Sequence, residues 1–201
     1  AFRREQEKVS GAVRGSAFHR VMELLDFSYV FMESGLFTEC PGDYEAYRKG
    51  LDEVRLKKRL EEFLLRETAS LRLTEEYAQA VNLTKIRHFL EQELAYRMWR
   101  AYEQGLLYRE QPFVMGIDAK RLDQDLPEGE KVLIQGIIDV FFIEDGEIVL
   151  LDYKTDVIDT MEALWSRYGV QIQYYEEALR KLMQLPVKER ILYSFYLEKY
   201  E

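Results

Sequence analysis

Cysteine is nearly absent from this sequence of 201 residues, with Cys40 as its single example. One thiol excludes an internal disulfide, a zinc site made of several cysteines and an iron–sulfur cluster. We therefore expect any metal to be held by carboxylate oxygens or imidazole nitrogens. The chain also begins at Ala1 rather than at methionine, and we expect it to be part of a longer protein.

Long apolar runs are missing as well. No stretch of about 18 apolar residues is present, and the first residues lack the apolar core of a signal peptide. Proline occurs four times, whereas hydrophobic residues make up 47% and aromatic residues 13% of the chain. These proportions predict one packed domain over residues 1–201, with a cytoplasmic location and no membrane partner.

Positive charge is in deficit, since 28 Lys and Arg residues face 37 Asp and Glu residues and the net charge is −9. This balance argues against a protein that holds nucleic acid by bulk electrostatics. A polyanionic substrate would need local basic groups or bridging cations. Residues 1–20 have a local positive surplus, although solvated charge is the commoner explanation of such a run. The basic residues there are Arg3, Arg4, Lys8, Arg14 and Arg20.

Motifs for nucleotide binding and for nucleophilic catalysis are also absent. The sequence has no G-x-x-x-x-G-K-[ST] phosphate loop, no glycine-rich dinucleotide fingerprint and no nucleophile elbow. These absences exclude an ATP site in this chain, a dinucleotide-dependent oxidoreductase and a serine hydrolase.

The first half of the chain reads as helical. Residues 15–27 predict a helix with Ser16 as its N-cap and His19 in its first turn. Its apolar face would consist of Phe18, Val21, Met22 and Leu25. Further helices are predicted near residues 44–66, 73–80 and 83–104.

The second half changes to short runs of β-branched and aromatic residues. Strands are predicted at residues 106–118, 131–143, 147–155 and 189–197, with a helix from about 160 to 184 between the last two. This order predicts an α/β fold with a small mixed sheet flanked by helices, and the apolar second and third strands require cover on both faces. We interpret residues 1–30 as a first core-helix region, 31–104 as a helical insertion and 105–201 as a β-β-β-α-β core.

An Asp-Gly pair at 145–146 sets the register of the second and third strands. Asp-Gly is the strong signal for a two-residue hairpin turn, in which Glu144 pairs with Glu147. Counting back along both strands, Asp139 falls opposite Asp152. Opposed like charges destabilise a sheet.

Lys154 shares a face with Asp152, because side chains alternate along a strand. Asp139 belongs to that face too. The predicted neighbours on it are apolar, so charge there is costly to desolvate. They are Ile137, Phe141, Ile143, Ile148 and Leu150.

Two explanations fit these charges. Lys154 could form a buried salt bridge with one acid, an arrangement that seldom adds much stability. Alternatively, both carboxylates could hold a divalent cation such as Mg²⁺, with Lys154 directed at a reacting group. We favour the cation, because the turn itself brings two acids and a lysine together.

The same residues carry a resemblance to a known family. The segments "GIID" at 136–139 and "LDYKTD" at 151–156 resemble the PD-(D/E)xK nuclease superfamily, in the branch close to RecB-type nucleases. The segment "RGSAFHRVMELLDF" resembles the histidine-bearing first helix of that branch, and Gln171 with Tyr175 fits its Gln-x-x-x-Tyr motif. The proline that names the superfamily is replaced by Ile138.

The resemblance implies a restriction-endonuclease-like core and a role for each matching residue. His19, Asp139, Asp152 and the backbone carbonyl of Tyr153 would bind the metal. Lys154 would orient or activate the attacking water, or steady charge on the phosphate.

Supporting residues follow from the same resemblance. Gln171 and Tyr175 would support the site and contact DNA, although ordinary packing between helices would explain them as well. Glu110 belongs to no motif, but on the first strand it could reach the site and is a secondary candidate, although it could equally be an edge charge. His88 matches no motif and is interpreted as structural.

The implied activity is that of a bacterial Mg²⁺-dependent exodeoxyribonuclease, with Mn²⁺ as a substitute. It would hydrolyse single-stranded DNA ends, and the 3′-terminated strand in particular, during double-strand-break processing and recombination repair. Helicase domains upstream in the same parent chain and a second protein chain would be its partners. The alternatives are a catalytically idle DNA-binding or docking module of the same fold and a free-standing exonuclease.

Overall fold

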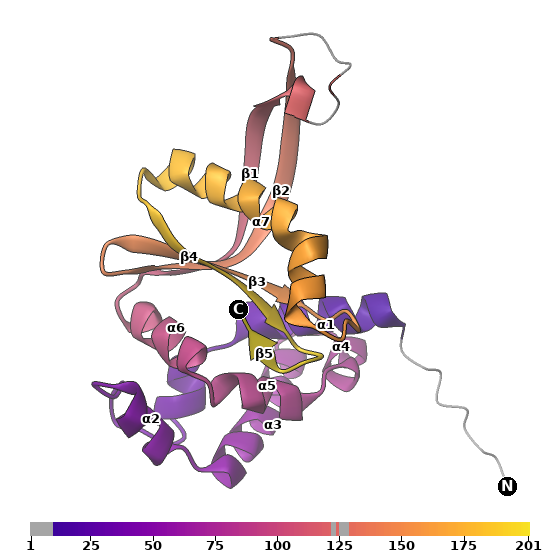
Figure 1. The fold of residues 1–201 in the computed structure, drawn as a ribbon. Helices are drawn as coiled ribbons and strands as arrows, with labels where there is room; N and C mark the ends of the chain where they lie inside the picture. Colours follow the sequence, from indigo (N-terminus) through magenta and orange to yellow (C-terminus); the bar gives the residue numbers. More distant parts are fainter. Residues whose placement is uncertain (1–9, 122–123, 125–128) are drawn as a thin grey trace, which may run out of the picture.

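The computed structural model describes residues 10–121, 124 and 129–201. A five-stranded sheet separates a layer of short helices from one long helix on the opposite face (Figure 1). Within the described part of the chain, no helix combines the length and the apolar character needed to span a membrane.

The sheet is mixed, as predicted, and its strands run in the order β1-β2-β3-β4-β5. Strands β3 and β4 are parallel, whereas the other neighbouring pairs are antiparallel. The parallel pair needs a crossover, which the long helix α7 (Met161–Met183) provides. The strands are β1 (Leu107–Asp118), β2 (Lys131–Glu144), β3 (Glu147–Lys154), β4 (Val187–Ser194) and β5 (Lys199–Tyr200).

Strand β4 is shorter than predicted, and β5 was not predicted at all. The chain turns after Ser194, whose hydroxyl accepts a hydrogen bond from the backbone N–H of Leu197 at 3.1 Å. That bond closes the turn from which β5 pairs back onto β4.

The other face of the sheet is covered by the first half of the chain. Its helical elements are α1 (Gly11–Leu24), the π-helical turn η1 (Ser28–Met32), α2 (Tyr44–Gly50), α3 (Glu53–Ala69), α4 (Glu75–Ala80), α5 (Leu83–Leu90) and α6 (Glu93–Glu103). A 3₁₀ turn, η2 (Ala119–Arg121), follows β1.

Helix α1 starts earlier than predicted. Ser10, not Ser16, is its N-cap, and the Ser10 side chain accepts a hydrogen bond from Val13 N at 3.2 Å. Ser16 lies exposed inside the helix, and His19 lies in the third turn rather than the first. The error arose because two serines could cap the same apolar pattern, and the earlier one satisfies the free N–H groups.

Two predicted long helices are each divided in two. The segment 44–66 breaks at Leu51 and Asp52, where Asp52 accepts a hydrogen bond from Arg55 N at 2.9 Å and caps α3. The segment 83–104 breaks at Glu91 and Gln92, where the backbone of Gln92 becomes extended. Each break lets a second amphipathic helix turn its apolar face toward the shared core.

Both faces of the sheet are packed, which confirms the predicted cover on both sides. On the helical side, Phe89 of α5 packs its ring edge against Tyr193 of β4 and Tyr153 of β3. On the opposite side, Leu150 and Leu192 lie in one core with the apolar face of α7. The segment predicted as an insertion therefore supplies most of one layer, to which α1 also belongs, and the division of the chain at residues 30 and 104 stays a prediction.

Strands β1 and β2 form a two-stranded ribbon, and at one point along it the alternation of side chains between the two faces of the sheet is reversed. Their ladder runs without a shift in register but skips the pair Glu110 and Asp139, and Glu110 has the left-handed φ of 49°. On one side of this point Arg109 faces the helical layer, whereas on the other side Met115, also odd-numbered, packs toward α7. A residue with positive φ breaks the strict alternation of side chains, so both acids sit at the crossover.

The face exchange corrects one detail of the predicted site. Ile137 was expected on the apolar surface around the acids, but it is 51% exposed on the outer face of the ribbon.

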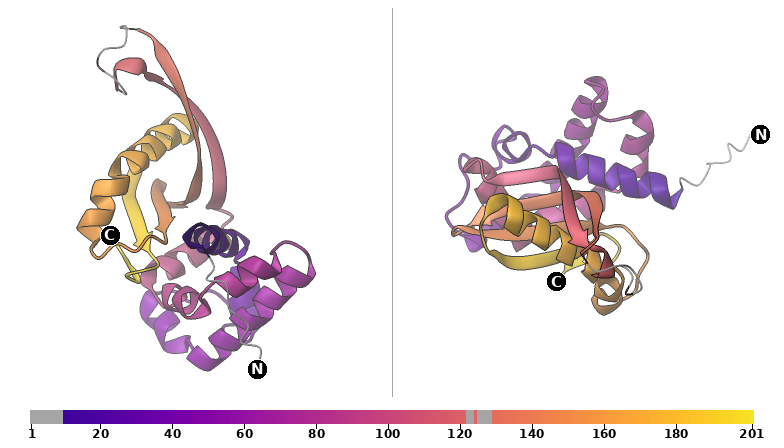
Figure 2. Two further views of the ribbon diagram at one scale, coloured as in Figure 1. Left: turned by 90° about the vertical axis from the view of Figure 1, so that its right-hand side faces the viewer. Right: turned by 90° about the horizontal axis from the view of Figure 1, so that it is seen from above.

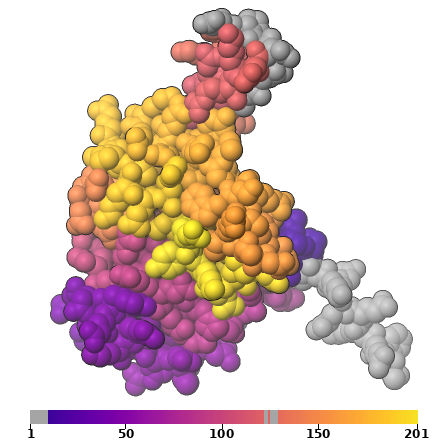
Figure 3. Space-filling model, viewed as in Figure 1, coloured from indigo at the N-terminus to yellow at the C-terminus, as the bar shows by residue number. Residues whose placement is uncertain are grey.

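Figure 2 shows that the ribbon of β1 and β2 arches away from the helical layer, with α7 on one side of it. In the space-filling view, the end of the ribbon near η2 projects from the body (Figure 3).

A carboxylate network fastens the β2–β3 turn to α6. Arg97 donates to both oxygens of Glu144, at 2.9 and 2.7 Å, and to both oxygens of Glu189 on β4. Hydrogen bonds from Arg97, assisted by Lys188, lower the pKa of Glu144 to about 2 despite its partial burial. Charge-assisted bidentate pairs of this kind are among the stronger ones.

Glu144→Gln is expected to reduce the free energy of unfolding at pH 7 by about 2 kcal/mol. The pKa of Glu144 is lower in the folded than in the unfolded chain, so its stabilisation is present above about pH 4.5 and is lost as the pH falls toward 2. Urea unfolding at pH 7 and pH 3 should therefore show the deficit shrinking by about half at pH 3. Glu45→Gln, which breaks an exposed pair with Lys49, is the control. An equal deficit at both pH values would contradict the network.

Candidate active site

Three side chains from separate elements meet at the crossover of β1 and β2. His19 of α1, Glu110 of β1 and Asp139 of β2 each offer a ligand atom, and these atoms all lie within 4.8 Å of one another. His19 Nδ1 lies 3.2 Å from Asp139 Oδ1. His19 and Glu110 also line an open hollow of about 420 Å³ along α1.

The charges in this cluster perturb one another. Burial alone would lower the pKa of His19, but the hydrogen bond to Asp139 and the surrounding carboxylates raise it overall. Burial raises the pKa of Glu110, and the charge of Asp139 raises it further. Groups whose pKa values are shifted by burial together with specific charged neighbours, as those of His19 and Glu110 are, are typical of functional sites.

Asp139 is fixed by the backbone of β3. The predicted register holds from Glu144↔Glu147 to Val140↔Leu151, and the ladder stops there. Instead of a backbone pair at the next position, Asp139 Oδ2 accepts a hydrogen bond from Tyr153 N at 2.8 Å. The carboxylate replaces a ladder carbonyl because the chain changes faces at Asp139, which leaves Oδ1 directed toward His19.

Asp152 and Lys154 form a second, adjoining group. They are 1% and 8% exposed, and Lys154 Nζ lies 2.6 Å from Asp152 Oδ2. Burial raises the pKa of Asp152, the charge of Asp139 raises it further, and Lys154 only partly offsets these effects. The Oδ2 atom makes an ion pair but no well-formed hydrogen bond with any described residue. One buried carboxylate oxygen is therefore left with unused acceptor capacity.

Helix α7 holds the lysine in place. Gln171 Oε1 accepts a hydrogen bond from Lys154 Nζ at 3.0 Å, and Gln171 Nε2 donates to the Tyr175 hydroxyl. The ring of Tyr168 lies 4.1 Å from the ammonium, and its hydroxyl donates to Asp156 at 2.8 Å. The aromatic face and the amide oxygen both attract the ammonium of Lys154 and fix its position.

Tyr168 was missed in the sequence. It precedes Gln171 by three positions and Tyr175 by seven, a spacing that places all three on one helix face. This spacing could have indicated that Tyr168 lies beside Gln171 and Tyr175, but Tyr168 belongs to no recognised motif.

The remaining predicted residues lie as follows. Tyr153 contributes its N–H to Asp139, and a role for its carbonyl stays a prediction. His88 contacts Arg87 and Glu198 rather than the acid cluster, in agreement with a structural role. Arg3, Arg4 and Lys8 lie outside the described residues.

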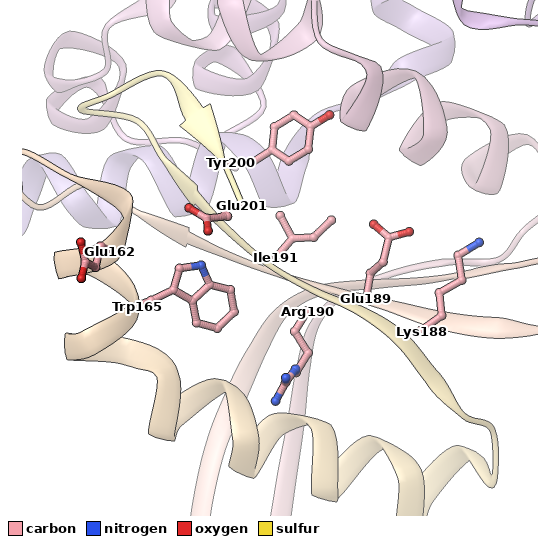
Figure 4. A pocket seen from close by; sticks show the side chains of 8 residues that line it. All are labelled: Glu162, Trp165, Lys188, Glu189, Arg190, Ile191, Tyr200 and Glu201. Atoms are coloured by element: carbon pink, nitrogen blue, oxygen red, sulfur yellow. The ribbon is translucent and has the colours of Figure 1, made fainter.

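A larger hollow lies elsewhere, at the edge of β4. It measures about 700 Å³, and Figure 4 shows Trp165 of α7 and the side chains of β4 that line it. Several of its charged residues are paired with neighbouring side chains, as Arg190 is with Glu176. The acid cluster is the candidate site because of its chemistry and not because of the size of its hollow.

The residues of the acid cluster fit a divalent cation. Two carboxylates and one imidazole within 4.8 Å are a suitable donor set for Mg²⁺ or Mn²⁺. The under-used Oδ2 of Asp152 adds a buried acceptor nearby. A cation would relieve the mutual repulsion of these carboxylates.

Asp152→Asn is expected to stabilise the metal-free chain at pH 7 by about 1 kcal/mol, because burial and the charge of Asp139 raise the pKa of Asp152 more than Lys154 lowers it. Urea unfolding in EDTA measures this difference, and the exposed Asp159→Asn provides the matched control. A loss of stability in EDTA would show that the ion pair with Lys154 outweighs the repulsion.

The motifs at the two carboxylates, the first-helix histidine and α7 together resemble most the C-terminal nuclease domain of AddA, and comparison with known proteins agrees. Proteins described as one component of an ATP-dependent helicase/nuclease are 34% identical in Lachnoclostridium phytofermentans and 39% identical in Clostridium botulinum, over 98% of this chain. The chain spans about 15% of the length of these curated relatives. A family model described as the PD-(D/E)XK nuclease superfamily matches residues 1–200, and the chain therefore belongs to that superfamily.

Proposed function

We propose that this nuclease domain hydrolyses phosphodiester bonds of single-stranded DNA with the help of Mg²⁺ or Mn²⁺. The observation that carries the proposal is the meeting of His19, Glu110 and Asp139 within 4.8 Å, beside the buried pair of Asp152 and Lys154. This arrangement combines a place for a cation with a fixed ammonium group.

His19, Glu110 and Asp139 would hold the cation, with Asp152 completing the donor set. A bound divalent ion acts as a Lewis acid on the phosphate and lowers the pKa of its water. Asp139 is already fixed by the hydrogen bond from Tyr153 N to its Oδ2, while its Oδ1 lies 3.2 Å from His19 Nδ1.

Lys154 would orient the attacking water or neutralise charge that develops on the phosphate. Its position is set by Asp152 at 2.6 Å and by Gln171 at 3.0 Å, so little reorganisation is needed during the reaction. Asp152 also balances the positive charge of the ammonium in its buried position. Gln171 and Tyr175 support this geometry and contact the DNA.

The wider assignment follows from the relatives. Because these are named as helicase/nuclease proteins, we propose that helicase domains of the same parent chain feed the 3′-terminated strand into this site. The work would take place in the bacterial cytoplasm during double-strand-break repair, together with an AddB-type partner protein. With a net charge of −9, the domain would depend on the cation and on delivery of the strand for binding.

Lys154→Met and His19→Ala are expected to reduce cleavage of labelled single-stranded DNA in Mg²⁺ or Mn²⁺ by roughly 100-fold or more. His88→Ala, which changes the other of the two histidines, should cleave like the wild type. The assay follows product length on denaturing gels, with Mn²⁺ binding measured by calorimetry.

The outcomes separate the alternatives. Loss of Mn²⁺ binding in His19→Ala but not in His88→Ala supports the metal site. Cleavage unchanged by Lys154→Met would contradict the assigned site. DNA binding without cleavage or metal binding would favour an idle docking module.

A further inference from the structure

We propose that a hollow on the other flank of α1 binds one unpaired nucleotide of the single strand, next to the scissile phosphate. The proposal rests on the proposed nuclease function. The hollow measures about 270 Å³ and lies between α1, the start of α5 and the turn after β4. Its lining residues are Arg14, Phe18, Asn82, Lys85, Thr155, Val157, Phe195 and Tyr196.

This nucleotide pocket adjoins the acid cluster directly. Gly15 lines the hollow that contains His19, and Thr155 lines the nucleotide pocket. A Cβ atom at Gly15 would lie 3.1 Å from Thr155 Oγ1, so a residue that lines one hollow lies close to a residue that lines the other. Phe195 N also donates to the carbonyl of Lys154 at 2.8 Å, which ties the pocket floor to the strand of the lysine.

The charge of the nucleotide pocket suits a phosphate group. No acidic residue lines it, whereas Glu23 and Glu110 line the neighbouring hollow. Lys85 is engaged with the carbonyls of Phe195 and Tyr196. The guanidinium of Arg14, by contrast, is exposed and makes no hydrogen bond or ion pair with any residue that the structure describes. On a chain of net charge −9, an unengaged cation here complements a phosphodiester.

The apolar part of the pocket suits a base. Phe18 and Phe195 form a buried floor, with ring centroids 4.5 Å apart. The ring of Tyr196 is 42% exposed at the rim, and the ammonium of Lys85 lies 5.7 Å from its centroid. A base can stack on such a ring only when it is unpaired and unstacked from its neighbours, which selects single strands.

Tyr196→Ala is expected to weaken the affinity of the 201-residue chain for a single-stranded oligonucleotide by roughly 5- to 100-fold, and Tyr196→Phe should restore it. The association constant falls as the salt concentration rises, and Arg14→Ala is expected to make the slope of log K against log salt concentration shallower by about 0.7. This is the value for one phosphate contact on a single strand. Fluorescence anisotropy in Ca²⁺ measures both. Arg55→Ala, an exposed arginine on α3, controls for the change in net charge.

An oligonucleotide with a single abasic site, moved one position at a time, locates the bound nucleotide. At one position adjacent to the cleavage site, the abasic change and Tyr196→Ala should remove the same stacking contact. The two changes together should therefore weaken binding no more than either change alone. Additive losses at every position would overturn the stacking assignment.

The two proposals fail in different ways. If the wild type cleaves DNA but Arg14→Ala and Tyr196→Ala both bind like Arg55→Ala, the pocket assignment is wrong and the nuclease function stands. If the wild type neither binds nor cleaves in any metal, both proposals are wrong.

Discussion

Repulsion among buried carboxylates is the constraint on which the rest of this structure depends. Asp139 and Asp152 occupy neighbouring positions at the end of an apolar sheet, and Glu110 adds a third acid from β1. Burial, and then the charge of Asp139, raise the pKa values of Asp152 and Glu110. Such an arrangement is costly in the metal-free chain, and a divalent cation is the simplest group that would offset the cost.

The surrounding fold keeps these acids together against their repulsion. The exchange of faces by β1 and β2 at Glu110 and Asp139 lets both side chains point toward α1 without breaking the register. The hydrogen bond from Tyr153 N fixes Asp139, and the packed rings of the helical layer hold α1 against the sheet. On the other face, α7 supplies Gln171 and Tyr168 to Lys154. Side chains from both layers therefore lie close to the C-terminal end of β3.

Much of the fold was predictable because its signals are local. The Asp-Gly turn at 145–146 set the register of β2 and β3 correctly, and the apolar runs on both sides of it correctly required two covering layers. Helix boundaries were less predictable, since Ser10 and Ser16 offer equivalent caps and only the packed structure selects one.

The site was predictable to a smaller extent. Counting along the hairpin placed Asp139, Asp152 and Lys154 in one region, but it could not foresee that the ladder would stop at Val140. The next residue, Asp139, lies across from Glu110 on β1, and nothing in the sequence signals the positive φ of that non-glycine residue. His19 was identified from a motif rather than from physics, because its partners lie some 90 to 120 positions away in the sequence.

Anomalous X-ray scattering from a crystal soaked in Mn²⁺ can show whether the acid cluster holds a cation. We expect one strong Mn²⁺ peak bounded by His19, Glu110 and Asp139, on the side facing Asp152. A well-ordered crystal whose anomalous map shows no peak there, with Asp152 and Lys154 unchanged at saturating Mn²⁺, would contradict it.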